Sequence, residues 1–306
     1  MRFTTLLSGL AISTLCAGSA LAQNTQSLTG TLAKIKETGA ITLGHRESSV
    51  PFSYYDDKQQ VVGYAMDLCY RIVNAVKREL HLDKLEVKLN PVTSATRIPL
   101  IANGTVDLEC GSTTNNLERE KQVSFTITHF VTANRFVSKK AANLKTVEDL
   151  RGKTIVSTSG TTNIKQITEI NAQKGLNLNI LAAKDHAEAF LMVETGRAAA
   201  FVMDDIIMYS LVAGSKAPGD YVISADPLSV EPYGIMLPRG DAPFKKVVDE
   251  EMIATYRSGA INTIYDKWFL SPIPPKGINL NVPMSASFKK VIANPTDSGD
   301  PAWYAQ

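Results

Sequence analysis

Strand-like and helix-like segments alternate along this 306-residue chain in two successive series. Alternation of this kind is typical of an open α/β sheet with helices on its faces. The first series ends near residue 130 and the second begins after residue 146. An apolar strand near 233–238 then precedes a helix that we interpret as the chain returning to the first unit. Strands are predicted at 40–45, 85–89, 106–110, 154–157, 177–181 and 199–203, with helices at 63–76, 97–102 and 146–152 among those between them.

Two lobes are the arrangement that this pattern favours. About 280 residues follow the N-terminal segment described next, more than one hydrophobic core usually serves. The predicted lobes are 23–132 for the first part of lobe 1, 133–235 for lobe 2, and 236–306 for the returning part of lobe 1 and a C-terminal tail. Because open α/β sheets bind ligands at the carboxyl ends of their strands, we expect a ligand cleft between two lobes joined by two crossings.

The first residues predict export from the cytoplasm. Arg2 supplies a positive charge, residues 6–15 form an apolar stretch, and Ala20-Leu21-Ala22 gives the small-x-small pattern of a signal-peptide cleavage site. We therefore predict a signal peptide over 1–22, with Cys16 in the discarded part. The apolar stretch is too short for a membrane-spanning helix, and no later segment is suited to span either. The expected product is an exported, soluble protein.

Two cysteines, Cys69 and Cys110, remain after cleavage. An even number of cysteines in an oxidising compartment favours a disulfide over two buried free thiols, which is the alternative. Cys69 lies on the predicted amphipathic helix and Cys110 ends a predicted strand. A bridge between them would close a loop of about forty residues and stabilise the fold by about 3–4 kcal/mol.

Composition argues against several classes of function. The formal charge of +2 falls to +1 once Arg2 is removed, so neither nucleic acid nor a membrane surface is an expected partner. The four histidines, at 45, 81, 129 and 186, show no metal-ligand spacing with each other or with the cysteines. The chain lacks a phosphate-binding loop and a Gly-x-Ser-x-Gly nucleophile elbow. We expect no metal and no cofactor.

The segment 108–119 carries the strongest functional signal in the chain. A strand ends at Gly111, and Ser112, Thr113 and Thr114 follow before a helix-like stretch around Arg119. Backbone N–H groups, hydroxyls and a helix N-terminus together favour an anionic ligand. The planar guanidinium of an arginine placed there can pair with a carboxylate through two hydrogen bonds. The alternative is a helix cap beside a solvated arginine.

These residues belong to a wider resemblance that covers the chain after the predicted signal peptide. The sequence resembles the polar-amino-acid family of periplasmic solute-binding proteins that feed ABC importers, and most closely its glutamate/aspartate-binding members. The resemblance implies the type II periplasmic-binding-protein fold. Its motifs are GHRESSVPFSYYD (44–56), TSATRIPL (93–100), ECGSTTNN (109–116), SGTT (159–162), KDH (184–186), MDD (203–205), DKWF (266–269) and PIPPK (272–276).

The resemblance implies a role for each group that surrounds the amino-acid end of the ligand. Arg119 would pair with the α-carboxylate, helped by Thr114 and by Thr161 and Thr162 at a helix start. The α-ammonium needs acceptors, for which the Ser112 carbonyl, the Thr114 hydroxyl and Asp204 are the candidates. Pattern alone does not separate Asp204 from its neighbour Asp205, and either could instead cap a helix.

A second set of residues is expected around a distal carboxylate. Arg46, Arg97, Ser94 and His186 provide cations and donors that a neutral amino acid would not require, since a dry cleft must pair each charge that it buries. Arg97 begins a predicted helix, where a cation opposes the helix dipole and favours a bound anion. A surface position for Arg46 and a structural role for His186 are the alternatives.

The sequence thus predicts a monomeric periplasmic binding protein, without catalytic residues, that delivers L-glutamate or L-aspartate to the membrane permease subunits of an ABC importer. The choice between the two ligands is left open because one methylene is worth about 1–3 kcal/mol. An enzyme on the same fold, such as a dehydratase, is an alternative in which His186 or Glu47 would serve as acid or base. A receptor sensor domain is a second alternative, disfavoured because no membrane helix follows.

Overall fold

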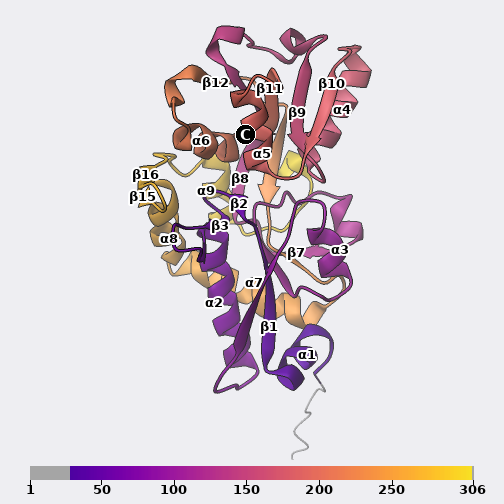
Figure 1. The fold of residues 1–306 in the computed structure, drawn as a ribbon. Helices are drawn as coiled ribbons and strands as arrows, with labels where there is room; N and C mark the ends of the chain where they lie inside the picture. The colour runs from indigo at the N-terminus through magenta and orange to yellow at the C-terminus, as the bar shows by residue number, and fades with distance from the viewer. Residues whose placement is uncertain (1–27, 305–306) are drawn as a thin grey trace, which may run out of the picture.

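The computed structural model describes residues 28–304, so the predicted signal peptide lies outside the described residues. The chain forms two α/β lobes, one above the other in Figure 1, which confirms the predicted fold class. The sheet of the first lobe has the strand order β5-β1-β6-β14-β7. Strands β1, β5 and β6 run parallel, and β14 joins them antiparallel. The bounds are β1 Ala40–His45, β5 Glu86–Pro91, β6 Leu108–Cys110, β7 Ser124–Phe125 and β14 Met236–Leu237.

The sheet of the second lobe has the order β10-β9-β11-β8-β12, and β13 pairs with β8 as well. Its first three strands are parallel, whereas β8 runs antiparallel to β11 and β12. Both sheets therefore present the carboxyl ends of parallel strands, the edge at which such sheets bind ligands. The bounds are β8 Phe130–Lys139, β9 Thr154–Thr158, β10 Asn179–Ala183, β11 Ala200–Asp204, β12 Tyr221–Ile223 and β13 Ser229–Tyr233.

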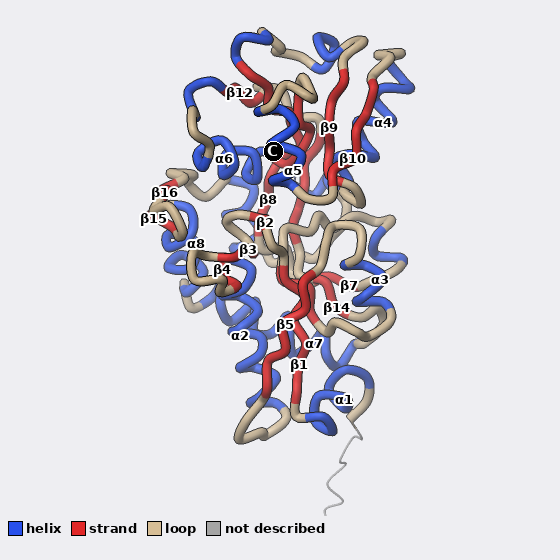
Figure 2. Tube along the Cα trace, in the orientation of Figure 1, coloured by secondary structure: helices blue, strands red, loops and turns tan. Residues whose placement is uncertain are grey.

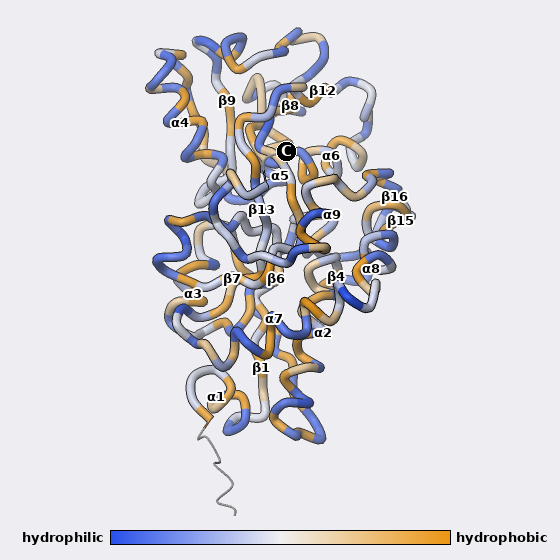
Figure 3. Tube along the Cα trace, turned by 180° about the vertical axis from the view of Figure 1, so that it is seen from behind, coloured by the Kyte–Doolittle hydropathy of each residue, from blue (hydrophilic) through white to orange (hydrophobic). Residues whose placement is uncertain are grey.

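Helices flank both sheets, as Figure 2 shows. Hydrophobic residues follow the central strands of each lobe, and hydrophilic residues lie on loops at the far ends (Figure 3). No helix within residues 28–304 is long and apolar enough to cross a membrane. The first lobe carries α1 Gly30–Thr38, α2 Tyr64–Glu79, α3 Arg97–Ala102, α7 Ala242–Arg257, α8 Ala260–Phe269 and α9 Ala286–Ala293, and the second carries α4 Thr162–Lys174, α5 His186–Glu194 and α6 Asp205–Gly214.

Two adjacent strands carry the chain between the lobes. β8 leads from the first lobe into the second and β13 leads back, and the two pair antiparallel, with Tyr233 opposite Phe130. β14 follows β13 directly and joins the first sheet. The expected lobe boundaries after residues 132 and 235 fall within and just after these strands and stay a prediction.

An aromatic cluster fixes the first-lobe end of this crossing. Phe130 stacks on Phe269 with ring centroids 4.9 Å apart, and Phe52 packs against both Phe130 and Tyr233. Each of these side chains is buried. Burial of one large apolar side chain is worth about 1.5–3 kcal/mol, so the crossing strands emerge from a firmly packed base.

A small three-stranded sheet and a hairpin complete the first lobe. One consists of β2 Ser48–Ser49, β3 Ser53–Tyr55 and β4 Val61–Val62, directly after β1. The other consists of β15 Pro272–Ile273 and β16 Ile278–Asn279, after α8. On the hairpin of β15 and β16, the ammonium of Lys276 donates a hydrogen bond to the carbonyl of Gly214 at the end of α6. This contact joins the two lobes at their edge.

Two of the predicted helices are wrong in kind. The stretch after Asn116 forms only a single 3-10 turn, Arg119–Lys121, and the helix expected over 146–152 is another 3-10 turn, Val147–Leu150. Asn116 accepts a hydrogen bond from the N–H of Arg119, as a helix cap does, but β7 begins at Ser124. The cap signals are present in both segments, and the strand that follows leaves no room for a longer helix.

Candidate functional site

Three arginines of the first lobe are buried at the edge that faces the second lobe. Arg46 follows β1, Arg97 begins α3, and Arg119 begins the 3-10 turn after β6. Only 2 %, 2 % and 7 % of their surfaces are exposed. Burial of a cation is costly unless it is paired. Such a concentration of guanidinium groups therefore indicates a site for anions rather than a packing element.

Backbone carbonyls hold Arg97 and Arg119 in place. Arg97 Nη1 donates to the Ser112 carbonyl at 3.3 Å and to the hydroxyl of Thr113. Arg119 Nη1 donates to the Thr114 carbonyl at 2.7 Å, and Nη2 donates to the Gly160 carbonyl of the second lobe at 3.2 Å. The hydroxyl-rich segment predicted from the sequence thus orients both guanidinium groups.

Several buried donors have no hydrogen-bond partner in the part of the chain that the structure describes. They include Arg46 Nη1, Arg97 Nε and the hydroxyl of Ser94. A buried polar group without a partner costs about 1–3 kcal/mol, and a charged one costs more. Burial, together with the neighbouring charge of Arg97, lowers the pKa of Arg46 to about 10 and that of Arg119 to about 9. These groups are suited to bind an anionic ligand.

His186 faces the arginines from the second lobe. It begins α5, is 1 % exposed, and its Nδ1 lies 2.8 Å from the hydroxyl of Thr158. Burial, followed by the positive charges of Arg46 and Arg97, holds the pKa of His186 well below its usual value. The imidazole is therefore neutral at physiological pH and acts as a donor or acceptor without adding charge.

The two adjacent aspartates at the end of β11 have different surroundings. Asp204 is 3 % exposed and accepts hydrogen bonds from Asn163 at 2.7 Å and from the hydroxyl of Tyr233. Asp205 instead lies 3.1 Å from Arg135 and binds Thr132 at 2.5 Å, both on β8. Asp204 therefore lies on the side of the arginines, whereas Asp205 ties α6 to the crossing strand.

The loop before α4 closes the site from the second lobe. Thr161 caps α4 by accepting from the N–H of Ile164, and Thr162 donates to Glu231 at 3.0 Å and lies 3.5 Å from the hydroxyl of Thr114. Gly160 approaches the first lobe so closely that a Cβ on it would lie 2.5 Å from the Cα of Ala95. Only glycine fits there, and the lobes are in contact around the arginines.

We call the resulting group the interlobe cluster. Sequence reasoning found most of its ligand-facing residues but gave no role to Glu109, Asn163, Tyr233 and Glu231. Glu109 stands inside the recognised motif, whereas Tyr233 and Glu231 lie on β13, which carries no local polar pattern. The cluster comprises Arg46, Arg97, Glu109, Arg119, His186, Asp204, Glu231 and Tyr233, with Ser94, Ser112, Thr114, Thr161 and Thr162 around them.

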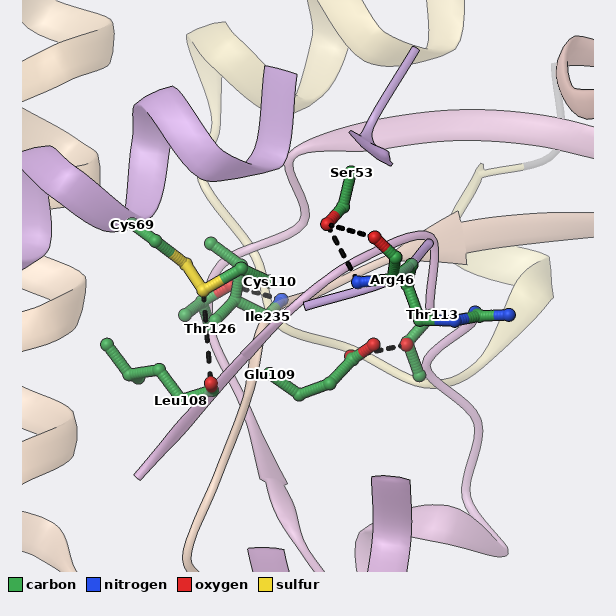
Figure 4. The surroundings of a disulfide bond; sticks show 9 residues. All are labelled: Arg46, Ser53, Cys69, Leu108, Glu109, Cys110, Thr113, Thr126 and Ile235. Atoms are coloured by element: carbon green, nitrogen blue, oxygen red, sulfur yellow. Dashed lines mark hydrogen bonds between the residues drawn. A yellow bond between two sulfur atoms is a disulfide. The ribbon is translucent and has the colours of Figure 1, made fainter. Parts of the chain in front are cut away.

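The predicted disulfide between Cys69 and Cys110 is confirmed. It joins α2 to the last residue of β6, with Cα atoms 6.2 Å apart and 41 positions between the cysteines in sequence (Figure 4). Cys110 lies between Glu109 and Gly111, so the bridge fixes the strand from which the hydroxyl-rich segment departs. It stabilises the site through the scaffold.

Two observations bear on the alternatives to binding. Within residues 28–304 there is no group of three or more His, Cys, Asp and Glu side chains that could hold a metal ion. Glu47, which is the alternative to His186 as the acid or base of an enzyme, is exposed and lies outside the interlobe cluster.

Fold and site together define a two-lobed binding protein for a small, charged solute. The chain belongs to the bacterial extracellular solute-binding proteins, family 3, whose model matches residues 41–271. The resemblance drawn from the sequence motifs is thereby confirmed.

Relatives of known function are similar over nearly the whole chain. This chain is 56% identical over 271 residues to the L-glutamate/L-aspartate-binding protein of Pseudomonas aeruginosa, and the match covers 88% of this chain and 90% of that protein. It is 46% identical over 284 residues to the glutamate/aspartate import solute-binding protein of Escherichia coli K12, covering 92% and 94%. Both relatives are named as binding proteins, which does not favour the enzyme alternative.

Solved structures of the same fold include an ancestral arginine-binding protein bound to arginine. The TM-score is 0.69 at 25% sequence identity, and the match covers 76% of this chain and 98% of that one.

Proposed function

We propose that this protein captures L-glutamate and L-aspartate in the periplasm by closure of its two lobes and delivers them to an ABC importer. The observation that carries the proposal is the set of three buried arginines, two of them with unpaired donors, faced by a neutral histidine. One arginine suffices for the α-carboxylate common to amino acids. The other two have only Glu109 as a buried counter-charge, which leaves one positive charge uncompensated unless the ligand carries a second carboxylate.

The α-carboxylate is assigned to Arg119. Thr114 and the N-terminus of α4, with Thr161 and Thr162, lie beside this guanidinium and supply further donors. The start of a helix of 13 residues favours a carboxylate through its free N–H groups and its dipole.

The α-ammonium is assigned to Asp204, the hydroxyl of Thr114 and the carbonyl of Ser112. Asp204 is a buried carboxylate of the second lobe whose charge, like those of Glu231 and Glu109, acts on Arg119. The Ser112 carbonyl already accepts from Arg97 and has a second lone pair to offer.

The distal carboxylate is assigned to Arg46 and Arg97, with Ser94 and His186. The unpaired Arg46 Nη1 and Arg97 Nε provide two charge-assisted hydrogen bonds, and Ser94 provides a third donor. A glutamine or asparagine ligand would leave a net positive charge buried in this pocket, and binding would be correspondingly weaker.

Closure follows from the division of these groups between the lobes. The ligand-free lobes would separate about β8 and β13, with the hinge near 132–134 and 233–236 and the lobe boundaries close to it. A ligand that contacts both lobes has differential affinity for the closed form and shifts the population toward it. The contact of Gly160 with Ala95 supports such a closed arrangement.

Delivery to membrane permease subunits is supported by the relatives, among them the Escherichia coli protein named for glutamate/aspartate import. A periplasmic location agrees with the extracellular family and with the predicted signal peptide. We propose that the protein works as a monomer, one ligand to each chain.

A thermal-shift screen against the twenty amino acids tests the proposal. A ligand that binds only the folded state stabilises it by about 2.7 kcal/mol at a hundred times its Kd. Glutamate and aspartate should give the largest shifts, and calorimetry should rank them above glutamine. Tighter binding of glutamine or of a basic amino acid would refute the assignment. Recovery of intact glutamate after hours of incubation separates binding from turnover.

A further inference from the structure

A carboxylate of the protein itself lies among the arginines of the distal pocket. Glu109 on β6 is completely buried, and its Oε1 lies 3.8 Å from Arg97 Nη1 (Figure 4 shows its carboxylate near Arg46). Its charge also acts on Arg46 and Arg119. This anion is present before any ligand arrives and belongs to none of the groups assigned to the ligand.

Local geometry holds this carboxylate in place. Its Oε2 accepts a hydrogen bond of 2.5 Å from Thr113, whose hydroxyl in turn accepts one from Arg97. A Cβ on Gly111 would lie 2.3 Å from Glu109 Oε1 and 3.0 Å from Arg46 Cγ. The glycine therefore makes room for the carboxylate, and the disulfide at Cys110 fixes the strand that carries it.

The carboxylate of Glu109 changes the net charge of the distal pocket. Arg46 and Arg97 alone would present two positive charges to the distal group of a ligand. Glu109 reduces this to a net charge of +1 in the distal pocket, because His186 is neutral. A buried site favours the ligand whose charge cancels its own, since each uncompensated charge is expensive in a low dielectric.

We propose that Glu109 determines specificity by limiting the distal pocket to one net positive charge, so that a singly charged carboxylate is accepted and a doubly charged phosphate is rejected. The inference rests on the proposed function and deepens it. O-phospho-L-serine is a suitable probe because it has a chain of similar length to glutamate and its phosphate, with a second pKa of about 6, carries almost two charges at pH 8.

The test compares wild type with Glu109→Gln by calorimetry at pH 8, with L-glutamate and O-phospho-L-serine. A glutamine side chain at position 109 has the same shape as the glutamate that it replaces, so any steric penalty of the phosphate is the same in both proteins. We expect the preference for glutamate over phosphoserine to fall at least tenfold in the variant. Asp107→Asn is the matched control, because it removes the same charge from a buried carboxylate of the first lobe that pairs with Lys34 at 2.9 Å, outside the interlobe cluster; its preference should stay within twofold of wild type.

Each outcome decides between the two proposals. Glutamate binding by wild type with a preference unchanged in Glu109→Gln would overturn the inference alone. Failure of wild type to bind glutamate would overturn the proposed function and the inference with it. An Asp107→Asn effect as large as that of Glu109→Gln would also contradict the inference, because the overall charge of the first lobe, not that of the distal pocket, would then set specificity.

Discussion

The two lobes bring different chemistry to the interlobe cluster. The first lobe contributes Arg46, Arg97 and Arg119, two of which are already oriented by its own carbonyls at Ser112 and Thr114. The second lobe contributes mostly uncharged donors and acceptors, among them the neutral imidazole of His186. The first lobe therefore resembles a preformed anion site, whereas the second completes it.

This difference assigns separate tasks to capture and closure. Cations held by short hydrogen bonds to their own lobe need little rearrangement when a carboxylate arrives. Second-lobe groups gain their ligand contacts only when the lobes meet, so they contribute to the free energy of closure. The predictions below, ordered by their expected effect on ligand affinity, separate the two contributions.

Arg119→Ala should have the largest effect. The substitution removes the partner of the α-carboxylate, which all amino acids share, and should weaken each ligand by about 3–5 kcal/mol or abolish measurable binding. Calorimetry with glutamate, aspartate and glutamine checks this. Arg71→Ala is the control and should bind all three ligands like wild type. It removes an arginine of α2 that pairs with Glu251 of α7, outside the interlobe cluster. Retained glutamate affinity in Arg119→Ala would place the α-carboxylate elsewhere.

Arg97→Ala should discriminate between ligands. It should weaken acidic ligands by about 2–5 kcal/mol, because a buried carboxylate loses its partner, while glutamine loses much less. Arg46→Ala should behave in the same way, and the two effects need not add, since both guanidinium groups bind one carboxylate. The same calorimetric series measures both. Equal losses for glutamate and glutamine would show that Arg97 is not part of a distal clamp.

Ligand affinity should fall below neutral pH because of Asp204. Burial and the charge of Glu231 raise the pKa of Asp204 to about 7, whereas a bound ammonium favours its ionised form and lowers that pKa. Affinity is thus highest above pH 7 and decreases as pH falls through 7, where binding releases a proton. The pKa of His186 lies well below 6.5, so it does not titrate in this range.

Calorimetry in buffers with different ionisation enthalpies measures the released proton. Asp204→Asn should bind more weakly and lose the pH dependence between pH 6 and 8. Asp205→Asn is the matched control, since Asp205 binds Thr132 and Arg135 instead of facing the cluster. An unchanged slope in Asp204→Asn would assign the titration to another group.

Removal of the disulfide should have the smallest effect on affinity. Replacing Cys69 and Cys110 by serine should lower the free energy of unfolding by about 3–4 kcal/mol, because the unfolded chain is no longer cross-linked. Glutamate affinity should stay within about fivefold, a cost of about 1 kcal/mol, since the bridge supports β6 and neither sulfur is assigned to the ligand. Chemical denaturation and calorimetry on the same sample test both parts. A complete loss of binding by a folded variant would mean that the bridge shapes the site itself.

Local sequence signals predicted much of the scaffold and part of the site. The strand Ala40–His45 has the bounds expected from its apolar pattern, and the cysteine pair followed from an even count in an exported chain. The helix expected at Arg119 failed because a cap signal says where a helix begins, whereas the room available before β7 decides its length. The roles of the ligand-facing residues came from the family resemblance.

Contacts between residues that lie apart in the sequence could not be predicted from local sequence patterns. Tyr233 donates to Asp204 from a crossing strand, and Glu109 is directed at Arg97 from within an otherwise apolar strand. Tyr233 has no local pattern that distinguishes it from an ordinary strand residue, and the motif that contains Glu109 does not show that its carboxylate faces Arg97. The structure also separated Asp204 from Asp205 through their partners, a distinction that depends on which face of the second lobe each carboxylate reaches.

Small-angle X-ray scattering with and without saturating L-glutamate tests most directly the claim that one ligand is shared between the lobes. Binding should lower the radius of gyration, because the first lobe binds the two carboxylates of the ligand and the second lobe contacts the ligand only when the lobes close. Glutamine at the same concentration should produce a smaller change. Superimposable scattering curves with and without glutamate, at a concentration where calorimetry shows full occupancy, would contradict the account.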